Sequence, residues 1–352
     1  MDILVLALVL ALAAANGAND VPKGVATLAG AGVARIRTAI AWGALTTAVG
    51  CLVSLHFASK MTALFSKGIV SAHPTPAFAA AVLTGTVAWV ALATWRSLPV
   101  STTHALTGSL LGAGALFASD AVQWGVLLAK VVQPLLLSVL VAWAGSALLT
   151  AVARLIGRGP ERRRADAPAV REPAPATVGG QSVSPAPTAA HGETAGSPNG
   201  IGVIGVAHWI TSGLTSFARG MNDAPKIVAI GSFALISGLT PTGLLIAVTI
   251  AMAVGGLLVG QKVADRLAAD VITMSHVEGF TANLTTATLV GLGAFQGLPL
   301  STTHVSIGAI SGTAGTDLSR IKKKTVRDFA IAWLVTPPFG AAVAAVAYLL
   351  LQ

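Results

Sequence analysis

The sequence predicts an all-α, polytopic membrane protein built as an inverted repeat, from its composition, its duplicated motifs and the placement of its basic loops. Hydrophobic residues make up 54% of the 352 residues and charged residues only 10%. Such a composition is typical of a chain that folds within a bilayer. Glycine and alanine are abundant, as expected where membrane helices pack closely.

The net charge of +9 does not indicate nucleic-acid binding, because the basic residues are concentrated in a few loops that membrane topology explains. Cys51 is the only cysteine, which excludes an intrachain disulfide and a cysteine metal cage. Residues 3–15 resemble the core of a signal peptide, but no basic segment precedes them. We expect them to form the first half of a mature transmembrane helix.

Long apolar segments alternate with short polar loops in the first half of the chain. Ile3–Val33 is apolar except at Asn16–Lys23, which predicts either one interrupted helix or two half-helices. A second span is expected at about residues 38–57, and residues 121–153 form the last span of this half. Phe78–Phe117 allows either two spans or a re-entrant hairpin with polar residues at its turn.

A segment of different composition separates the two halves. Residues 157–200 contain an arginine run followed by Pro, Ala, Gly, Ser and Thr, with almost no large apolar residue. Such a segment cannot bury enough surface to offset its ordering entropy. We therefore expect a disordered cytoplasmic linker between an N-terminal repeat, residues 1–156, and a C-terminal repeat, residues 201–352.

Two polar motifs occur once in each half, inside apolar segments. Asn-Asp-x-Pro-Lys stands at residues 19–23 and again at 222–226, and Leu-Pro-x-Ser-Thr-Thr-His stands at 98–104 and 298–304. The copies are 203 and 200 residues apart. Charged residues and proline are costly at membrane depth, so they indicate a functional site. We expect the four segments to meet at one site.

The basic loops indicate that the two repeats have opposite orientations. If basic loops are cytoplasmic, residues 35–37 and 154–164 lie inside, which places both chain termini and the loop at 119–120 outside. The equivalent of that loop in the second half, residues 320–324, is basic and would be cytoplasmic. The basic loop at 60–67 fits less well, because it would lie outside. Inverted repeats with interrupted helices indicate a secondary transporter with a midplane site.

The residue types of the motifs suggest the chemistry of this site. Each Ser-Thr-Thr turn supplies three hydroxyls, and a helix that begins there adds free N–H groups and a positive dipole end, which together bind an oxyanion. The Asn-Asp pairs supply oxygens that suit a hard monovalent cation or a proton. An anion beside carboxylates needs a cation between them, which is a physical reason for coupled transport.

Several of these residues also have structural interpretations. A hydroxyl in a membrane helix can simply bond to a carbonyl, and an isolated Asn-Asp can cap a helix. His104 and His304 can be packing residues rather than proton carriers. Lys23 and Lys226 can extend to an interface or form internal ion pairs. Glu278 can lie at a cavity mouth or at a helix end.

Charged residues near the motifs are not all duplicated. Arg219 begins the second Asn-Asp motif, where the first copy has Asn16, so it lacks a charged counterpart. Arg96 and Glu278 also lack one. These residues are therefore places where the two repeats differ.

The motifs resemble the signatures of the inorganic phosphate transporter (PiT) family. The resemblance is carried by Gly-Ala-Asn-Asp-Val at 17–21, Gly-x-Asn-Asp at 220–223 and both Leu-Pro-x-Ser-Thr-Thr-His segments, in the right order. It implies a symporter in the cell membrane that takes up inorganic phosphate with sodium or protons. It also implies an inverted-repeat fold that is found as a homodimer, with no cofactor besides the coupling ion.

The resemblance also implies roles for single residues. Phosphate would be surrounded by Asp20, Ser101, Thr102, Thr103, Asp223, Ser301, Thr302 and Thr303. The coupling sodium ion or proton would be held by Asn19, Asp20, Asn222 and Asp223. His104 and His304 would lie just behind the phosphate ligands. Family members usually have an amide where this chain has Lys23 and Lys226, so the two lysines would compensate charge near the cation sites.

The sequence is also compatible with other functions. The family contains a sulfate permease branch, so a sulfate or other oxyanion permease is one alternative, and a passive anion channel is another. An intramembrane hydrolase could use Ser, His and Asp. Because every candidate nucleophile is duplicated, a single asymmetric active site is disfavoured and no enzyme is predicted.

Overall fold

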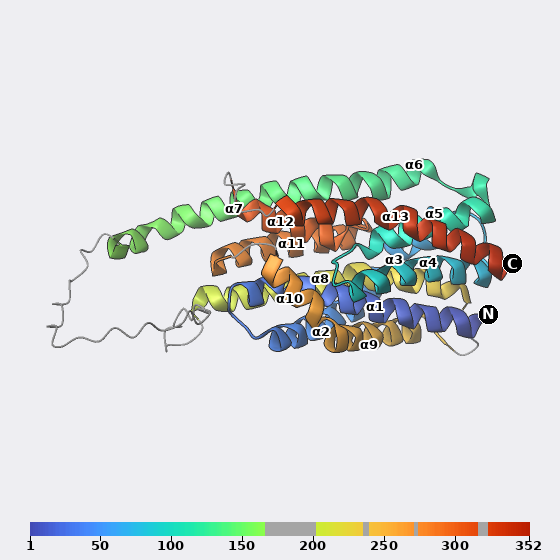
Figure 1. Ribbon diagram of the computed structural model, residues 1–352, viewed down its shortest axis with the longest axis horizontal. Coiled ribbons are helices and arrows are strands. Elements are labelled where there is room, and N and C mark those ends of the chain that lie inside the picture. The colour runs from blue at the N-terminus through green and yellow to red at the C-terminus, as the bar shows by residue number, and fades with distance from the viewer. Residues whose placement is uncertain (166–201, 235–238, 271–273, 316–322) are drawn as a thin grey trace, which may run out of the picture.

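The computed structural model describes residues 1–165, 202–234, 239–270, 274–315 and 323–352, and these ranges are almost entirely helical (Figure 1). The helices are α1 Asp2–Gly30, α2 Ile36–Val53, α3 Ser59–Ala63, α4 Pro76–Trp95, α5 Thr102–Phe117, α6 Trp124–Leu127, α7 Gln133–Ala165, α8 Val203–Gly231, α9 Pro241–Val259, α10 Gln261–Asp270, α11 His276–Gln296, α12 Thr302–Thr313 and α13 Lys323–Leu351. Single turns of 3₁₀ or π helix lie at residues 54–56, 64–68, 119–121, 128–132 and 232–234.

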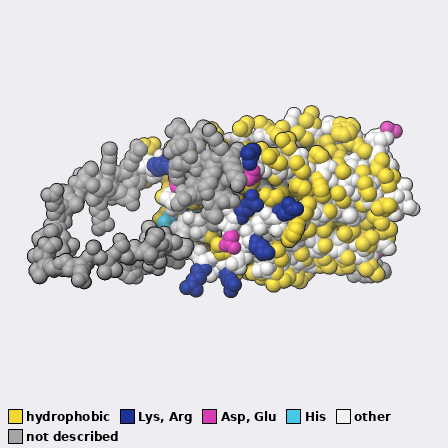
Figure 2. Space-filling view, viewed as in Figure 1, with side chains coloured by type: hydrophobic (Ala, Val, Ile, Leu, Met, Phe, Trp, Pro, Cys, Tyr) yellow, Lys and Arg dark blue, Asp and Glu magenta, His cyan; other side chains and the backbone are white. Residues whose placement is uncertain are grey.

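The predicted class, an all-α polytopic membrane protein, is confirmed. Six helical stretches in the described part of the chain are long and apolar enough to cross a membrane: Asp2–Gly30, Ile36–His56, Pro76–Trp95, Trp124–Ile156, Pro241–Val259 and Arg327–Leu351. Figure 2 shows hydrophobic side chains over most of the wide part of one face, with Lys and Arg gathered toward the end from which α7 projects. This surface suits a bilayer around its apolar part.

Equivalent helices of the two halves run in opposite directions (Figure 1). α1 begins at the end of the molecule where both chain termini lie, whereas α8 begins at the other end. α7 likewise runs away from the termini, and α13 runs toward the C-terminus. The last turns of α7 and the start of α8 therefore lie opposite the two termini.

The helices that carry the Asn-Asp motifs are not interrupted, so the prediction of broken helices at these motifs is wrong. α1 continues through Pro22, and α8 continues through Pro225. A proline removes one backbone donor, and a membrane helix tolerates this loss where neighbouring helices and polar side chains surround the backbone. The breaks lie instead between α4 and α5 and between α11 and α12.

Each of these breaks is the tip of a helical hairpin, one of the two arrangements expected from the sequence. α5 has 16 residues and α12 has 12, both fewer than the roughly 20 that a span requires. α5 packs against α4, and α12 against α11. The two tips therefore lie within the bundle rather than at its surface.

The two halves of the chain interleave. α9 packs against α1 and α2 against α8, while α13 packs against α5 and α7 against α12. Gly17 of α1 and Gly220 of α8 are equivalent residues, 203 positions apart. A Cβ at Gly17 would overlap the carbonyl oxygen of Met252, and a Cβ at Gly220 would overlap that of Thr47. These glycines allow the backbones to approach closely, as small residues do in membrane bundles. The core of each half therefore includes helices of the other.

The boundaries expected for the two repeats and the linker remain a prediction, and α7 crosses one of them. α7 extends to Ala165, beyond the predicted start of the linker at residue 157. Alanine, arginine and glutamate, which are frequent at 161–165, are good helix formers and extend the helix. The remainder of the predicted linker lies outside the described residues.

Two short helices cover the hairpin tips of the opposite half. In α10, the Nη1 of Arg266 donates to the carbonyl of Arg96 at the first tip, at 3.2 Å. In α3, Lys60 lies against Gly297 at the second tip. Gly297 has φ +76°, and its equivalent 200 residues earlier, Ser97, has φ 56°. Both tips therefore use a left-handed residue to reverse the chain.

Candidate functional site

The two hairpin tips meet at the centre of the molecule. The Thr103 hydroxyl donates to the carbonyl of Leu300 at 3.4 Å, and the Thr303 hydroxyl donates to the carbonyl of Val100 at 2.9 Å. Each of these hydrogen bonds joins a threonine hydroxyl of one half to a backbone carbonyl of the other half. The two tips therefore hold each other in place. The Ser-Thr-Thr turns of both repeats thus lie together, as expected from their duplication.

The serines and histidines of the tips form one repeated arrangement. Ser101 and Ser301 cap α5 and α12, each accepting from the backbone N–H of the histidine three residues later, at 3.3 and 3.2 Å. Each serine also bonds to the Nδ1 of its histidine, at 2.8 and 2.7 Å. The rings of His104 and His304 stack with centroids 4.5 Å apart, and Trp333 stacks on His304. The serine hydroxyls are therefore engaged in caps, and the histidines join the two tips.

Asn19 anchors the first tip. Its Nδ2 donates to the Thr94 hydroxyl at 3.0 Å and to the carbonyl of Leu98 at 2.9 Å, while its Oδ1 accepts from the N–H of Val100 at 3.0 Å. Both ends of this amide are thus used to hold the loop before α5. Asn19 therefore has a structural role as well as its predicted place beside the cation.

Asn222 holds the second tip less completely. Its Nδ2 donates to the carbonyl of Leu300 at 3.0 Å and to Asp223 at 2.9 Å. Its Oδ1 and the Oδ2 of Asp223 have no hydrogen-bond partner in the described part of the chain. The second copy of the motif thus keeps two buried oxygens available to a ligand.

Lys23 joins α1 to both tips. Its ammonium group contacts the carboxylate of Asp20, donates to the carbonyl of Val100 at 2.5 Å and donates to the Thr303 hydroxyl at 2.8 Å. The Lys23 side chain is only 4% exposed. Lys23 therefore forms an internal ion pair, and the alternative that it extends to the membrane interface is excluded.

Lys226 makes the equivalent contacts from α8. Its ammonium group lies 3.1 Å from Asp223, donates to the Thr103 hydroxyl at 2.7 Å and approaches the carbonyl of Leu300 at 3.4 Å. It is 1% exposed. Each lysine thus links the aspartate on its own helix to a threonine on the hairpin of the other repeat.

The carboxylates of Asp20 and Asp223 lie close enough to interact with each other as well as with the two lysines. Like charges in a buried site repel strongly unless cations lie between them. The ammonium groups of Lys23 and Lys226 supply that compensation here. The four residues predicted to hold a coupling cation therefore share their site with two fixed positive charges.

Two further residues belong to the site, Asn16 and Arg219. The Nδ2 of Asn16 donates to Asp20 at 2.7 Å and to the Thr102 hydroxyl at 2.8 Å. The Nη2 of Arg219 donates to the Ser306 hydroxyl at 2.5 Å. Both residues open the Asn-Asp motif in their copies, 203 residues apart. Their shared position, at the start of a motif that carries the site residues, is the sequence feature that indicates a role in the site.

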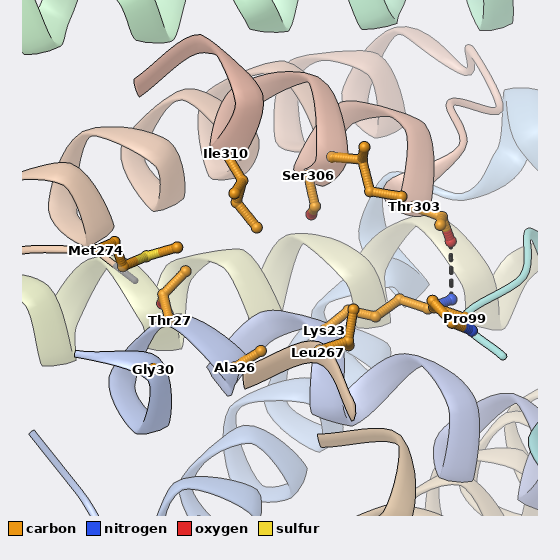
Figure 3. Close-up of a pocket in the computed structure, with 11 residues that line it drawn as sticks. Lys23, Ala26, Thr27, Gly30, Pro99, Leu267, Met274, Thr303, Ser306 and Ile310 are labelled. Carbon is orange, nitrogen blue, oxygen red and sulfur yellow. Dashed lines mark hydrogen bonds between the residues drawn. The ribbon is translucent and has the colours of Figure 1, made fainter. Parts of the chain in front are cut away.

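A pocket leads to this centre from the end of the molecule opposite the termini. Figure 3 shows Lys23 hydrogen-bonded to Thr303 in the pocket, while Gly30 lies on the last turn of α1. The pocket lies between α1, α10 and α12 and is lined by Lys23, Ala26, Thr27, Gly30, Pro99, Leu267, Met274, Thr303, Ser306, Ile307 and Ile310. It therefore connects the buried lysine and threonine to the side on which α7 ends.

The two sides of the centre differ in polarity. On the pocket side, the Thr27 hydroxyl lies 3.1 Å from His208 Nε2 and accepts from Asn283 Nδ2 at 2.8 Å. The equivalent positions in the other repeat, 203 residues away, are Ile230 for Thr27 and Val5 for His208, and both are buried in the apolar core. The equivalent positions toward the termini are therefore filled by apolar packing, whereas the other side holds a cluster of hydrogen-bonded polar side chains.

Glu278 lies at a helix end, one of the two positions expected from the sequence. It forms a capping box with Ser275 at the start of α11 and pairs with the guanidinium of Arg154 at 2.7 Å. In the described residues, no group of three or more His, Cys, Asp or Glu side chains is placed to hold a metal ion. The chemistry of the site thus lies in its hydroxyls, amides, lysines, carboxylates and one arginine.

Residues 16–344 match the family described as the phosphate transporter family. A "Probable low-affinity inorganic phosphate transporter" of Mycobacterium tuberculosis H37Rv is 26% identical over 344 residues, which are 95% of this chain and 73% of that protein. A protein with the same description in Bacillus subtilis strain 168 is 24% identical over 363 residues, covering 100% and 97%.

A solved structure has the same fold. It is described as "The sodium-dependent phosphate transporter" and superposes with a TM-score of 0.75 at 22% identity, covering 99% of this chain and 98% of that one. At this identity the likeness establishes the arrangement of the helices. The residues at the centre must be interpreted from their own contacts.

Proposed function

This chain belongs to the phosphate transporter family, and we propose that it is a secondary active transporter that imports inorganic phosphate together with a cation, sodium or a proton. The observation that carries the proposal is the meeting of two Ser-Thr-Thr tips, one from each half, around two buried lysine–aspartate pairs. Helix starts with free hydroxyls and N–H groups bind tetrahedral oxyanions. The names of the curated relatives support phosphate as that anion.

In this proposal the two halves form an inverted repeat that works by alternating access. The opposite directions of equivalent helices support the inversion, and the interleaved packing lets one pair of helices rock against another. The pocket that ends at Lys23 and Thr303, together with the apolar packing on the other side, corresponds to a state open toward the linker. With a cytoplasmic linker, this is the state that releases phosphate into the cell.

Phosphate binds between the two tips. Thr102, Thr103, Thr302 and Thr303 contribute hydroxyls, and the first N–H groups of α5 and α12 contribute backbone donors. In the described state, Lys226 donates to Thr103 and Lys23 to Thr303. Phosphate entering between the tips takes over these donors, while Ser101 and Ser301 keep the helix starts in place by capping them.

The coupling cation binds at the carboxylates of Asp20 and Asp223 with the amides of Asn19 and Asn222. Lys23 and Lys226 act there as fixed cations, because their ammonium groups supply part of the positive charge that a bound ion would otherwise supply to the carboxylates. The similar solved structure is described as a sodium-dependent transporter, which favours sodium as the ion. The two lysines reduce the charge that this ion must supply, because each already contacts one carboxylate.

In the cell, the protein is a homodimer in the plasma or inner membrane, with both termini outside and the linker in the cytoplasm. The two termini at one end of the molecule and the basic residues toward the other support this orientation. Large apolar side chains exposed on α7, such as Leu136 and Leu140, are available to lipid or to a second copy.

Flux into liposomes that contain the purified protein tests the function. Phosphate, sulfate and arsenate are offered with a sodium gradient, with a proton gradient and with neither. We expect phosphate to accumulate in the liposomes only when a sodium or proton gradient is present. Accumulation of sulfate in preference to phosphate would establish the oxyanion permease, and equal flux without any gradient would establish a passive channel.

A further inference from the structure

The two copies of the Asn-Asp motif differ at one buried position. Asn16 in α1 and Arg219 in α8 are equivalent, 203 residues apart, and are 0% and 1% exposed. In the first copy, Asn16 forms a compact network by donating to Asp20 and to the Thr102 hydroxyl, while its Oδ1 has no hydrogen-bond partner in the described chain. Its two Nδ2 hydrogens are thereby used.

In the second copy this network stays open. The longer side chain of Arg219 extends to Ser306 on α12 and leaves the guanidinium Nε and Nη1 without a hydrogen-bond partner in the described chain. Thr302, the equivalent of Thr102, makes no side-chain hydrogen bond there either. A buried guanidinium with unused donors is costly. Unused buried donors indicate a missing acceptor.

The charges of the site also indicate an anion. Lys23 contacts Asp20 and Lys226 contacts Asp223, so each ion pair is balanced. Arg219 is attracted by both carboxylates, but it adds a third positive charge to two negative ones. The described centre therefore carries an excess of one positive charge on side chains that are almost fully buried.

We propose that Arg219 is a phosphate ligand that donates to the anion through guanidinium N–H groups that have no partner in the described chain. This inference rests on the proposed function and names the charged group that recognises the anion. A guanidinium is always charged and carries several N–H donors, which makes it a suitable ligand for phosphate oxygens. Ser306 lines the pocket and accepts from Nη2, so the guanidinium contacts a residue of the pocket wall. The first repeat has no equivalent, so the anion binds off the centre, nearer α8.

Proteoliposome uptake and thermal unfolding test this role. Arg219→Asn gives the second copy the residue of the first, and we expect the KM for phosphate to rise at least tenfold. The rise in Tm that phosphate causes in the wild-type protein should disappear, while the Tm without phosphate should not fall, since an uncompensated charge is removed. Arg96→Asn is the matched control, because Arg96 is exposed beside Trp95 and outside the pocket; both readouts should stay at wild-type values.

Two more variants keep the test decisive if Arg219→Asn does not fold. Arg219→Lys retains the charge with fewer N–H donors, and Ser306→Ala removes the hydrogen bond between Nη2 and the pocket wall; each should raise the KM severalfold. An unchanged KM and an unchanged phosphate-dependent Tm shift in these variants would overturn the assignment. If the wild-type protein neither takes up phosphate nor shows a higher Tm in its presence, the proposed function itself is wrong, whatever the role of Arg219.

Discussion

Lys23 of α1 donates a hydrogen bond of 2.8 Å to the hydroxyl of Thr303 at the start of α12, 280 residues later in the chain. Lys226 of α8 makes the equivalent bond to Thr103, at 2.7 Å. Each bond joins an ion pair of one repeat to the hairpin tip of the other. The proposed anion and cation sites are therefore linked through two lysines.

The first prediction concerns these lysines. Replacing Lys23 and Lys226 by asparagine, singly and together, leaves Asp20 and Asp223 without their contact cations, and a buried unpaired carboxylate costs about 3–5 kcal/mol. A sodium ion can take the place of each ammonium. We expect the variants to acquire a sodium requirement or to move more cations per phosphate, measured as phosphate uptake against sodium concentration.

An exposed lysine provides the control for this prediction. Lys67→Asn removes the same charge at an exposed position and should leave the cation dependence as in the wild-type protein. If the double variant also keeps that dependence, the lysines have no part in coupling.

The second prediction concerns the threonine hydroxyls. Thr102→Val and Thr302→Val preserve shape but remove a donor to phosphate, and a charge-assisted hydrogen bond contributes about 1.5–3 kcal/mol. We expect the Kd for phosphate to rise roughly tenfold or more in each. Thr84→Val is the matched control, because its hydroxyl only donates to the carbonyl of Ala80 at 2.7 Å. Unchanged phosphate affinity in both site variants would falsify the assignment.

The third prediction tests the inversion of the repeats. Ser119 is exposed in the connection between α5 and α6, which lies near the termini in Figure 1. Its equivalent 200 residues later is Ser319, outside the described residues. Cysteines introduced at the two positions in a Cys51→Ser background should react with an impermeant thiol reagent from opposite sides of the membrane. Reaction from one side only would mean that the repeats have the same orientation.

The fourth prediction concerns stability at the hairpin tips. Ser97 adopts a left-handed conformation with φ 56°, which glycine adopts at lower cost. Ser97→Gly should therefore stabilise the protein by about 1 kcal/mol, measured by thermal unfolding in detergent. Gly297→Ser should destabilise it by more, because a Cβ there lies 2.5 Å from the Cβ of Lys60. A loss of stability in Ser97→Gly would contradict this account of the tips.

The class of the protein and many of the residues that meet at its centre could be predicted from the sequence. Apolar segments of spanning length establish a membrane fold, because the bilayer fixes the length that a helix must have. Asp20, Lys23 and their copies were recognisable because charge at membrane depth is costly and persists only where it has a use. The duplicated Ser-Thr-Thr segments indicated two equivalent turns, and the structure brings them together.

Only the tertiary structure decided how these residues contact one another. No local signal reveals that Lys23 reaches Thr303 or that Asn19 holds the loop before Val100, since these partners belong to different helices and are set by the interleaving of the halves. Local proline chemistry predicted a break in α1, but the packed neighbours keep that helix continuous through Pro22. Arg219 was visible as an unmatched charge, and its unused guanidinium nitrogens appear only when the fold brings its side chain to Ser306 of α12. Sequence determines which groups must be buried, whereas long-range packing determines which of them remain free to bind a ligand.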